Sequence, residues 1–475
     1  MSTNIRVSGD VHPRLVDGFE RIRREIRLPE EFPPAALEEA ERVAADPAAA
    51  TRQDLTHLPF VTIDPPGSMD LDQAVLIEAP GPGYRVWYAI ADVGAFVRTG
   101  GALDAEARLR GETVYLPDGK VPLHPQVLSE GAASLLPGVT RPAAVWRIDL
   151  DAEGRTVGVD VQRALVRSRE RLDYDYVQAA VDTGTADGTL KLLAEVGRLR
   201  LELERARGGV TLPTPEQEIV TADSGYRLEY RVPRPSEAWN AQISLLTGMA
   251  AASMMLDAEI GVLRVLPPPR SGDLATVRRA ALALGVPWPE GATYGQVVHG
   301  LDPKVPAHAA FLNESKVLLR GSGYVAFDGE PPSQAGHAAV AAPYAHVTAP
   351  LRRLVDRYAT EVCLAIAAGE PVPDDIQAAL GGLPEIMSVT GRRAGAVERA
   401  SVDLVEAFVL RDRIGHSFDA VVIDVDERRP GGLVQLTDPA VIARCDGTPM
   451  PLGQPVRVRL TQADPGTREV RFTLA

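Results

Sequence analysis

Three aspartates lie within nine residues of one another and could bind a cation together: Asp64, Asp70 and Asp72. The segment 65–67, Pro-Pro-Gly, cannot continue a helix or a regular strand, so the chain must turn and bring these carboxylates close to one another. Carboxylates packed this closely need a cation. Hard oxygen ligands suit Mg²⁺ or Mn²⁺, and Mg²⁺ shares its remaining positions with waters and substrate phosphates. The spacing therefore indicates phosphoryl-transfer chemistry.

The competing interpretation of the same segment is an acidic loop exposed to water. For an isolated acidic triplet this interpretation would be the better one, because aspartates are common in solvated turns. The residues that follow the triplet decide between the two interpretations.

Those residues resemble, block after block and in order, the catalytic domain of the RNase II/RNB family of exoribonucleases. The similar blocks are Thr62–Ala74 (family TIDxxxxxDxDDA), Ala89–Val93 (HIADV, with Ala89 where His is usual), Leu103–Pro117 (LDxxAxxRGxSxYLP), Val121–Leu135 (PMLPxxLSxxxxSL) and Tyr344–Arg353 (HFTSPIRRY). The ordered series is more specific than any single block and spans roughly residues 58–413. The resemblance implies a hydrolase that degrades RNA from the 3′ end and releases nucleoside 5′-monophosphates.

The resemblance also implies a metal site. Asp64, Asp70 and Asp72 would hold the ions, and Asp72 occupies the position on which the family depends most. Gln73 stands where the family has a further aspartate, so an uncharged amide oxygen would join the ligands and bind one ion more weakly. His346 is a candidate neighbour of the metal or phosphate, although a core or helix-entry histidine is the favoured interpretation.

Four further residues take binding roles from the resemblance. Arg352 is similar to the arginine that clamps the phosphate near the scissile bond, and Glu398 to a glutamate close to the leaving nucleotide. Tyr115 is similar to the tyrosine that stacks on the 3′-terminal base, and Tyr174 to one linked to recognition of ribose. Taken alone, each could be a surface charge or a buried tyrosine. The second stacking ring would fall near 215–219, where the sequence has no aromatic.

Composition fits a globular enzyme. The chain has 475 residues, of which 45% are hydrophobic and 24% charged. A net charge of -14 argues against nucleic-acid binding on an open basic surface, but an enzyme that encloses one strand can be acidic outside. No apolar stretch is long enough to cross a bilayer, and Cys363 and Cys445 lack metal or disulfide spacing. We expect a cytoplasmic monomer with single-stranded RNA as its partner and no obligate protein partner.

Three regions follow one another along the chain, and together they predict an α+β fold. Residues 1–57 have an apolar stripe at helical spacing and predict a small helical segment. Residues 58–414 alternate β-rich runs with helical runs, as a large mixed RNB-like catalytic domain would; helices are expected at 190–207 and at 351–368, a run that includes Arg352. Residues 415–475 fit a five-stranded OB barrel similar to an S1 domain, and their only aromatics, Phe418 and Phe472, are expected in its core. Short alternating strands are expected at 418–425, 432–436, 456–460 and 469–474.

The favoured function is a metal-dependent 3′–5′ exoribonuclease that acts on single-stranded RNA, with Mg²⁺, or alternatively Mn²⁺, as cofactor. An alternative from another class is an RNA-binding regulator on the same scaffold, made catalytically weak by Gln73. A third alternative is an endonuclease that uses the same metal site.

Overall fold

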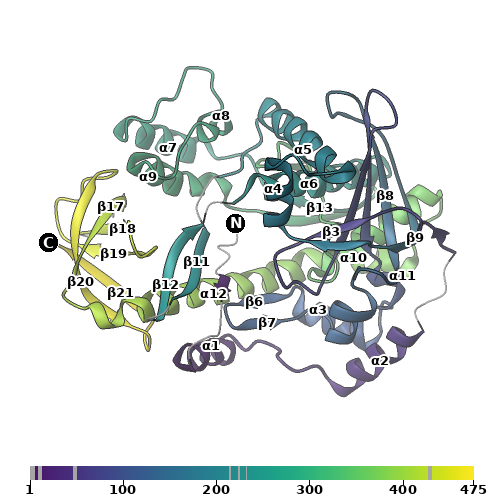
Figure 1. The fold of residues 1–475 in the computed structure, drawn as a ribbon, viewed down its shortest axis with the longest axis horizontal. Coiled ribbons are helices and arrows are strands. Elements are labelled where there is room, and N and C mark those ends of the chain that lie inside the picture. The colour runs from purple at the N-terminus through teal and green to yellow at the C-terminus, as the bar shows by residue number, and fades with distance from the viewer. Residues whose placement is uncertain are drawn as a thin grey trace.

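A seven-stranded mixed sheet forms the centre of the molecule, with strand order β10-β3-β4-β5-β8-β9-β2 (Figure 1). The computed structural model describes residues 6–8, 13–46, 51–212, 216–222, 225–231, 233–425 and 430–475. The strands of this sheet are β2 (Gln53–Asp54), β3 (Val61–Ile63), β4 (Gln73–Glu78), β5 (Tyr84–Ala91), β8 (Thr140–Leu150), β9 (Thr156–Arg167) and β10 (Glu170–Leu172). Strands β3, β4, β5, β8 and β9 pair antiparallel, whereas β10 and β2 add parallel edges.

Helices pack on this sheet and bury one large apolar core. They include α4 (Tyr174–Asp182), α5 (Gly188–Arg207), α6 (Pro235–Asp257), α10 (Leu354–Ala368) and α11 (Asp374–Leu380). Trp146 of β8 and Tyr358 of α10 lie fully inside this core. Gly197 allows α5 to approach α6, because a Cβ atom there would lie 2.5 Å from the Cβ of Trp239. The helical runs expected near residues 190–207 and 351–368 are confirmed, although α10 begins three residues later than predicted.

The longest helix, α12 (Leu383–Leu410), runs from the catalytic domain to the C-terminal barrel (Figure 1). Three antiparallel strand pairs and three further helices belong to the described part of the chain between α5 and α10. Their elements are β13 (Ile260–Val265), α7 (Ser271–Ala283), α8 (Tyr294–His299), α9 (Pro306–Ser315), β14 (Gly323–Asp328), β15 (Gly336–His337), β16 (Ala342–Pro343), β11 (Glu216–Ala222) and β12 (Gly225–Arg231). Among the described residues, no helix is both long and apolar enough to cross a membrane.

Two helices near the N-terminus confirm the helical pattern expected there. They are α1 (Pro13–Ile26) and α2 (Pro34–Ala45), and the short strand β1 (Arg6–Ser8) pairs with β11. Helix α1 packs against α12, and its Arg23 forms an ion pair with Asp118, in the turn between β6 (Val114–Leu116) and β7 (Gly119–Val121). Helix α2 packs against α3 (Ala102–Arg110). The N-terminal helices therefore pack on α3, α12 and the turn between β6 and β7. The domain boundaries 1–57, 58–414 and 415–475 remain predictions.

The C-terminal region closes into a five-stranded barrel with the order β17-β18-β19-β21-β20, which confirms the expected OB-type fold. Its strands are β17 (Ser417–Val425), β18 (Gly432–Leu436), β19 (Ile442–Asp446), β20 (Pro455–Asp464) and β21 (Glu469–Leu474). The rings of Phe418 and Phe472 meet edge to face inside the barrel, with centroids 5.9 Å apart. The two phenylalanines are therefore core residues, as their place in the alternating pattern predicts, and present no stacking surface.

A buried carboxyl group joins α12 to the barrel and gives stability a dependence on pH. Glu406 accepts hydrogen bonds from the Gln217 amide (2.9 Å) and the Ile442 backbone (3.0 Å). Burial raises the pKa of Glu406 from 4.5 to about 8. The folded state therefore binds more protons than the unfolded state between these pH values, and stability falls as the pH rises through this window.

We expect Glu406→Gln to remove this loss, because the amide oxygen can accept the same two hydrogen bonds without a charge. The variant should unfold at a higher urea concentration than wild type at pH 8 but not at pH 5. Between the two pKa values of Glu406, each pH unit lowers the free energy of unfolding of the wild type by up to about 1.4 kcal/mol. Glu385→Gln, at an exposed position of the same helix, is the matched control. Equal pH slopes for wild type and Glu406→Gln would contradict this assignment.

Candidate active site

The aspartate loop connects β3 to β4, and a glycine turn and several hydrogen bonds fix its conformation. Gly67 adopts a φ of 82°, which favours glycine, and allows the chain to turn after the two prolines. Ser134 holds the far side of the loop, because its hydroxyl donates to the Met69 carbonyl (2.6 Å) and accepts from the Leu71 backbone N–H (3.0 Å). Arg171 donates to the Ser68 carbonyl. The loop is therefore a positioned element, as a binding site requires.

Asp72 is the most enclosed of the three carboxylates, with 3% of its surface exposed. Its Oδ1 accepts the Leu351 backbone N–H at 2.7 Å, and its Oδ2 lies 3.3 Å from Nε of Arg352. Asp70 has different partners, since its Oδ1 lies 2.9 Å from the Lys120 ammonium and its Oδ2 accepts from the Tyr115 hydroxyl at 3.3 Å. The structure thus brings Asp70, Asp72, Tyr115 and Arg352 together.

The electrostatics of the loop favour a cation. Burial raises the pKa of Asp64 to about 7 and that of Asp72 to about 8; nearby Arg352 opposes both shifts, and the charge of Asp70 adds to them. Oδ2 of Asp64 is buried and has no hydrogen-bond partner among the described residues. A divalent cation would satisfy this oxygen and favour the ionised carboxylates. The donor set therefore fits Mg²⁺ or Mn²⁺.

The carboxylates do not form a closed metal cage. In the described part of the chain, no group of three or more His, Cys, Asp or Glu side chains is gathered closely enough to hold a metal ion. Mg²⁺ commonly uses only one or two carboxylates together with waters and substrate phosphates. The metal ligands named from the sequence remain a proposal.

Gln73 is built into the fold, which the sequence did not predict. Its Nε2 donates to the Thr348 carbonyl at 2.6 Å, and its Oε1 accepts from the Tyr88 hydroxyl at 2.9 Å. The Tyr88 hydroxyl also shares a hydrogen bond with Ser244. Gln73 therefore links β4 to β5 and to the segment that precedes Arg352, and a carbonyl oxygen retains a second lone pair for a ligand.

We expect Gln73→Ala to destabilise the protein by about 1–3 kcal/mol, because it leaves buried polar groups of Thr348 and Tyr88 without this partner. Urea unfolding at fixed pH measures the change. Gln377→Ala is the control, since Gln377 donates to Asp328 on an exposed surface. A loss no greater than that of the control would show that the Gln73 link contributes little.

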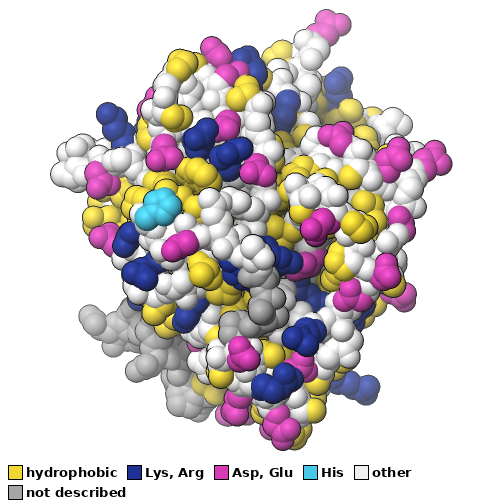
Figure 2. Space-filling model, turned by 90° about the vertical axis from the view of Figure 1, so that its right-hand side faces the viewer, with side chains coloured by type: hydrophobic (Ala, Val, Ile, Leu, Met, Phe, Trp, Pro, Cys, Tyr) yellow, Lys and Arg dark blue, Asp and Glu magenta, His cyan; other side chains and the backbone are white. Residues whose placement is uncertain are grey.

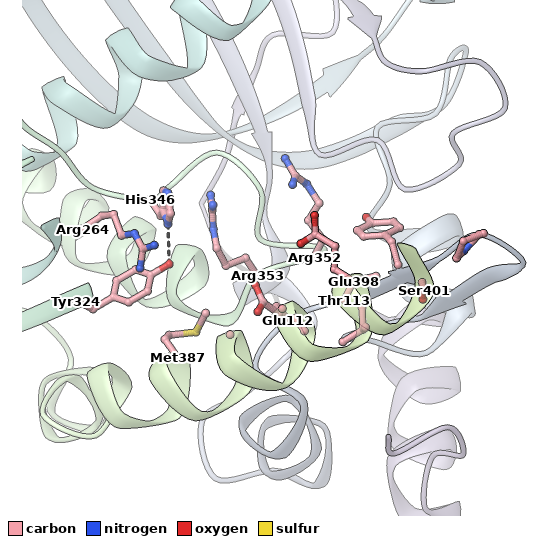
Figure 3. Close-up of a pocket in the computed structure, with 16 residues that line it drawn as sticks. Glu112, Thr113, Arg264, Tyr324, His346, Arg352, Arg353, Met387, Glu398 and Ser401 are labelled. Carbon is pink, nitrogen blue, oxygen red and sulfur yellow. Dashed lines mark hydrogen bonds between the residues drawn. The ribbon is translucent and has the colours of Figure 1, made fainter. Parts of the chain in front are cut away.

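A pocket of about 640 Å³ opens next to the aspartate loop. Five parts of the chain line it: the segment around β6, strands β13 and β14, the segment just before α10, and one face of α12 (Figure 3). Its lining includes Tyr115, Arg352 and Glu398, so three of the predicted binding residues share one cavity. This volume lies within the range of pockets that hold small ligands.

Arg352 reaches the pocket because it is not part of a helix. The sequence pattern predicted a helical position, but α10 begins at Leu354, and Arg352 lies in the turn before it. The backbone of Arg353 explains the difference, because it is extended (φ −145°, ψ 121°) and forms an isolated β-bridge with Glu112, so the helix begins only after it. Thr113 also donates to the Arg352 carbonyl, which fixes this turn against the β6 segment.

Of the other residues predicted from the sequence, His346 lines the pocket and Tyr174 does not. Tyr174 begins α4, and burial together with the charge of Asp64 raises its pKa to about 12; it is not in the pocket lining. His346 does line the pocket, where its Nδ1 lies 2.7 Å from the Tyr324 hydroxyl. The expected second stacking position near 215–219 falls partly outside the described residues, and the structure does not test it.

Sequence reasoning missed several residues of the site: Lys120, Ser134, Arg264, Tyr324 and Arg353. Ser134 and Arg353 lie inside blocks of the family pattern, which was a usable signal, whereas Lys120 lies between two of these blocks. Arg264 and Tyr324 lie on neighbouring strands β13 and β14, where they face each other in register, and no local pattern marks them.

Comparison with known proteins agrees with this fold. Residues 52–366 match the RNB domain, and residues 416–475 match the RNase II-type exonuclease C-terminal S1 domain. The chain therefore belongs to the RNB family.

Within that family the chain is similar to Ribonuclease R proteins. It is 28% identical to Ribonuclease R of Escherichia coli over 481 residues, which cover 90% of this chain and 58% of the relative. It is 25% identical to Ribonuclease R of Thermotoga maritima, over 99% of this chain and 72% of the relative. The chain thus spans little more than half the length of the Escherichia coli relative.

Two solved structures share the fold. Mycoplasma genitalium RNase R in complex with ribose-methylated single-stranded RNA has a TM-score of 0.87 at 21% identity, covering 98% of this chain and 78% of that one. Yeast Ssd1, a pseudonuclease, has a TM-score of 0.75 at 17% identity, covering 97% of this chain and 58% of that one.

Proposed function

We propose that this protein is a metal-dependent hydrolytic exoribonuclease that degrades single-stranded RNA from the 3′ end and releases nucleoside 5′-monophosphates. One observation carries the proposal: Arg352 lies against Asp72 of the aspartate loop and also lines the adjoining pocket. Phosphodiester hydrolysis at a chain end needs three parts: carboxylates that fit a cation, an arginine for the phosphate, and a cavity of nucleotide size. The similarity to Ribonuclease R supports the same activity.

Asp64, Asp70 and Asp72, with the amide oxygen of Gln73, are the residues proposed to hold the cation. When bound, divalent ions activate water and stabilise the attacking and leaving oxygens of the phosphodiester. The Lys120 ammonium balances the charge of Asp70 in the structure described here. The expected ion is Mg²⁺, with Mn²⁺ as the alternative.

The protein side chains bind and orient the RNA. Arg352 donates from its planar guanidinium to the phosphate at the scissile bond, and Tyr115, half-exposed at the edge of the pocket, stacks on the 3′-terminal base. Glu398 lines the pocket from α12 (Figure 3), and in this proposal it faces the leaving nucleotide. Tyr174 lies near Asp64, where its hydroxyl can contact a ribose 2′-hydroxyl and favour RNA over DNA. We further propose that the protein acts as a monomer in the cytoplasm.

An RNA-binding protein without turnover is the alternative function. The uncharged Gln73 and the similarity in fold to a pseudonuclease favour it. The ion pair between Asp72 and Arg352 argues for activity, because it places a proposed metal ligand next to the arginine proposed to bind the phosphate.

The two functions give different results with a 5′-labelled, unstructured RNA. We expect wild-type protein to shorten this RNA progressively from its 3′ end with Mg²⁺ or Mn²⁺ and to leave it intact with a chelator. RNA that is bound but intact with every metal would contradict the exoribonuclease and support the alternative.

A further inference from the structure

The pocket extends beyond the residues to which the proposed reaction assigns a role. Arg352 and Glu398 line one part of it, and Arg264, Tyr324 and His346 are grouped in another part (Figure 3). The second group comes from β13, β14 and the segment after β16, and we call it the Arg264 arm. Nothing in the proposed hydrolysis uses these three side chains.

Arg264 is held as a hydrogen-bond donor. Its guanidinium carbon lies 4.6 Å from the centroid of the Tyr324 ring, and its Nη2 donates to Ser322 at 2.9 Å. An arginine has five N–H donors, so these contacts leave several donors for a ligand. Within the described ranges no carboxylate forms an ion pair with Arg264, whereas Arg353 is paired with Asp356.

The surroundings of the arm favour an anion. Burial and the charge of Arg353 lower the pKa of His346, so the imidazole is neutral, and its hydrogen bond with the Tyr324 hydroxyl (2.7 Å) fixes the ring on which Arg264 stacks. Glu112 is a carboxyl group that also lines the pocket; burial raises its pKa, and the charges of Arg353 and Arg264 oppose this shift. Arg264 thus presents a positive charge that no neighbouring side chain is placed to neutralise by direct pairing.

Small residues form the floor between the two parts of the pocket, and the Glu112 carboxyl lies above it, with Oε1 3.6 Å from the position that a Cβ of Gly391 would take. Gly391, Ala394 and Gly395 occupy one face of α12, and they line the pocket together with Glu398. Residues spaced three and four apart on a helix share a face, and here they carry at most a methyl group. The small side chains on this face widen the pocket between Arg352 and Arg264, and a nucleoside placed there would lie beside Glu112.

We propose that Arg264 and Tyr324 form a subsite for a phosphate group on the 3′ end of RNA, so that RNAs ending in a 3′-phosphate are substrates of this protein. The inference rests on the proposed function. An exonuclease that releases monophosphates from the 3′ end holds one nucleotide beyond the scissile phosphate. With that phosphate at Asp72 and Arg352, the terminal nucleotide occupies the pocket and its 3′ group faces the Arg264 arm.

Binding without cleavage tests the subsite. The probe is a fluorescent oligoadenylate that ends in either a 3′-hydroxyl or a 3′-phosphate, titrated with Asp72→Asn protein in the presence of a chelator. We expect the 3′-phosphate to bind about tenfold more tightly, as one or two charge-assisted hydrogen bonds provide. Adding Arg264→Gln should bring the two affinities to within about twofold, and Arg264→Lys should leave an intermediate ratio because it retains the charge but not the planar fork.

Arg392→Gln is the matched control, because it removes one arginine from the exposed side of α12 and should leave the tenfold ratio unchanged. Equal affinity for the two ends before Arg264 is changed overturns the subsite, and so does a ratio that survives Arg264→Gln. Failure of the proposed function has a separate signature, namely wild-type protein that does not shorten the 3′-hydroxyl RNA with metal. Absence of binding to either oligonucleotide overturns both proposals.

Discussion

Asp72→Asn should lower the rate of RNA hydrolysis by at least about 10³-fold while the protein stays folded and still binds RNA. Asparagine has nearly the same shape and can still accept the Leu351 backbone N–H, so the turn that carries Arg352 is retained. It lacks the charge that would attract a divalent ion to the loop. Single-turnover cleavage of 5′-labelled RNA measures the rate, and fluorescence anisotropy in chelator measures the binding.

Asp149→Asn is the control for the loss of one aspartate from the same sheet. Asp149 pairs with Arg85 at 2.6 Å between β8 and β5, and it does not line the pocket. We expect near wild-type cleavage by this control. Comparable activity of Asp72→Asn and wild type would show that the aspartate loop is not the catalytic centre.

The second large effect concerns Arg352. Arg352→Lys should reduce the single-turnover rate by about 10²-fold with little change in RNA affinity, because lysine keeps the positive charge near Asp72 but cannot offer the planar pair of donors to a phosphate. Arg352→Ala should be slower still, since it also leaves Asp72 without its ion-pair partner. The rate at saturating protein separates chemistry from binding.

Arg392→Lys tests whether such a change matters at any arginine near the pocket. Arg392 lies on the exposed side of α12 and donates to Ser388. We expect this variant to cleave at the wild-type rate. If Arg352→Lys does so as well, the phosphate role of Arg352 is wrong.

Much of the fold could be predicted from the sequence, because it depends on local periodicity. Alternating apolar residues located strands β17, β18, β20 and β21, and the inward positions of Phe418 and Phe472 followed from the same alternation. Strand β19 was expected only through the count of five, since its inward residues, Ala443 and Cys445, are small and lack the β-branched or aromatic side chains typical of strands. The helices α5 and α10 were predicted from helical spacing and composition, with an error of a few residues at their starts.

The candidate site could be predicted only where its residues are neighbours in sequence or belong to a family block. The aspartate loop is such a case. The hydrogen bond from Gln73 to the Thr348 carbonyl joins residues 275 positions apart, and no local pattern reports it. Arg264 and Tyr324 become neighbours only because β13 and β14 pair antiparallel, so their role required the structure.

The most direct test of the account is the identity of the products formed over time from one internally labelled RNA, supplied in linear and in circular form. Wild-type protein with Mg²⁺ should convert the linear RNA to nucleoside 5′-monophosphates and leave the circle intact. Cleavage of the circle would demonstrate endonuclease activity, and mononucleotides that carry a 3′-phosphate instead of a 5′-phosphate would show that a different bond is broken. Either result would contradict the account.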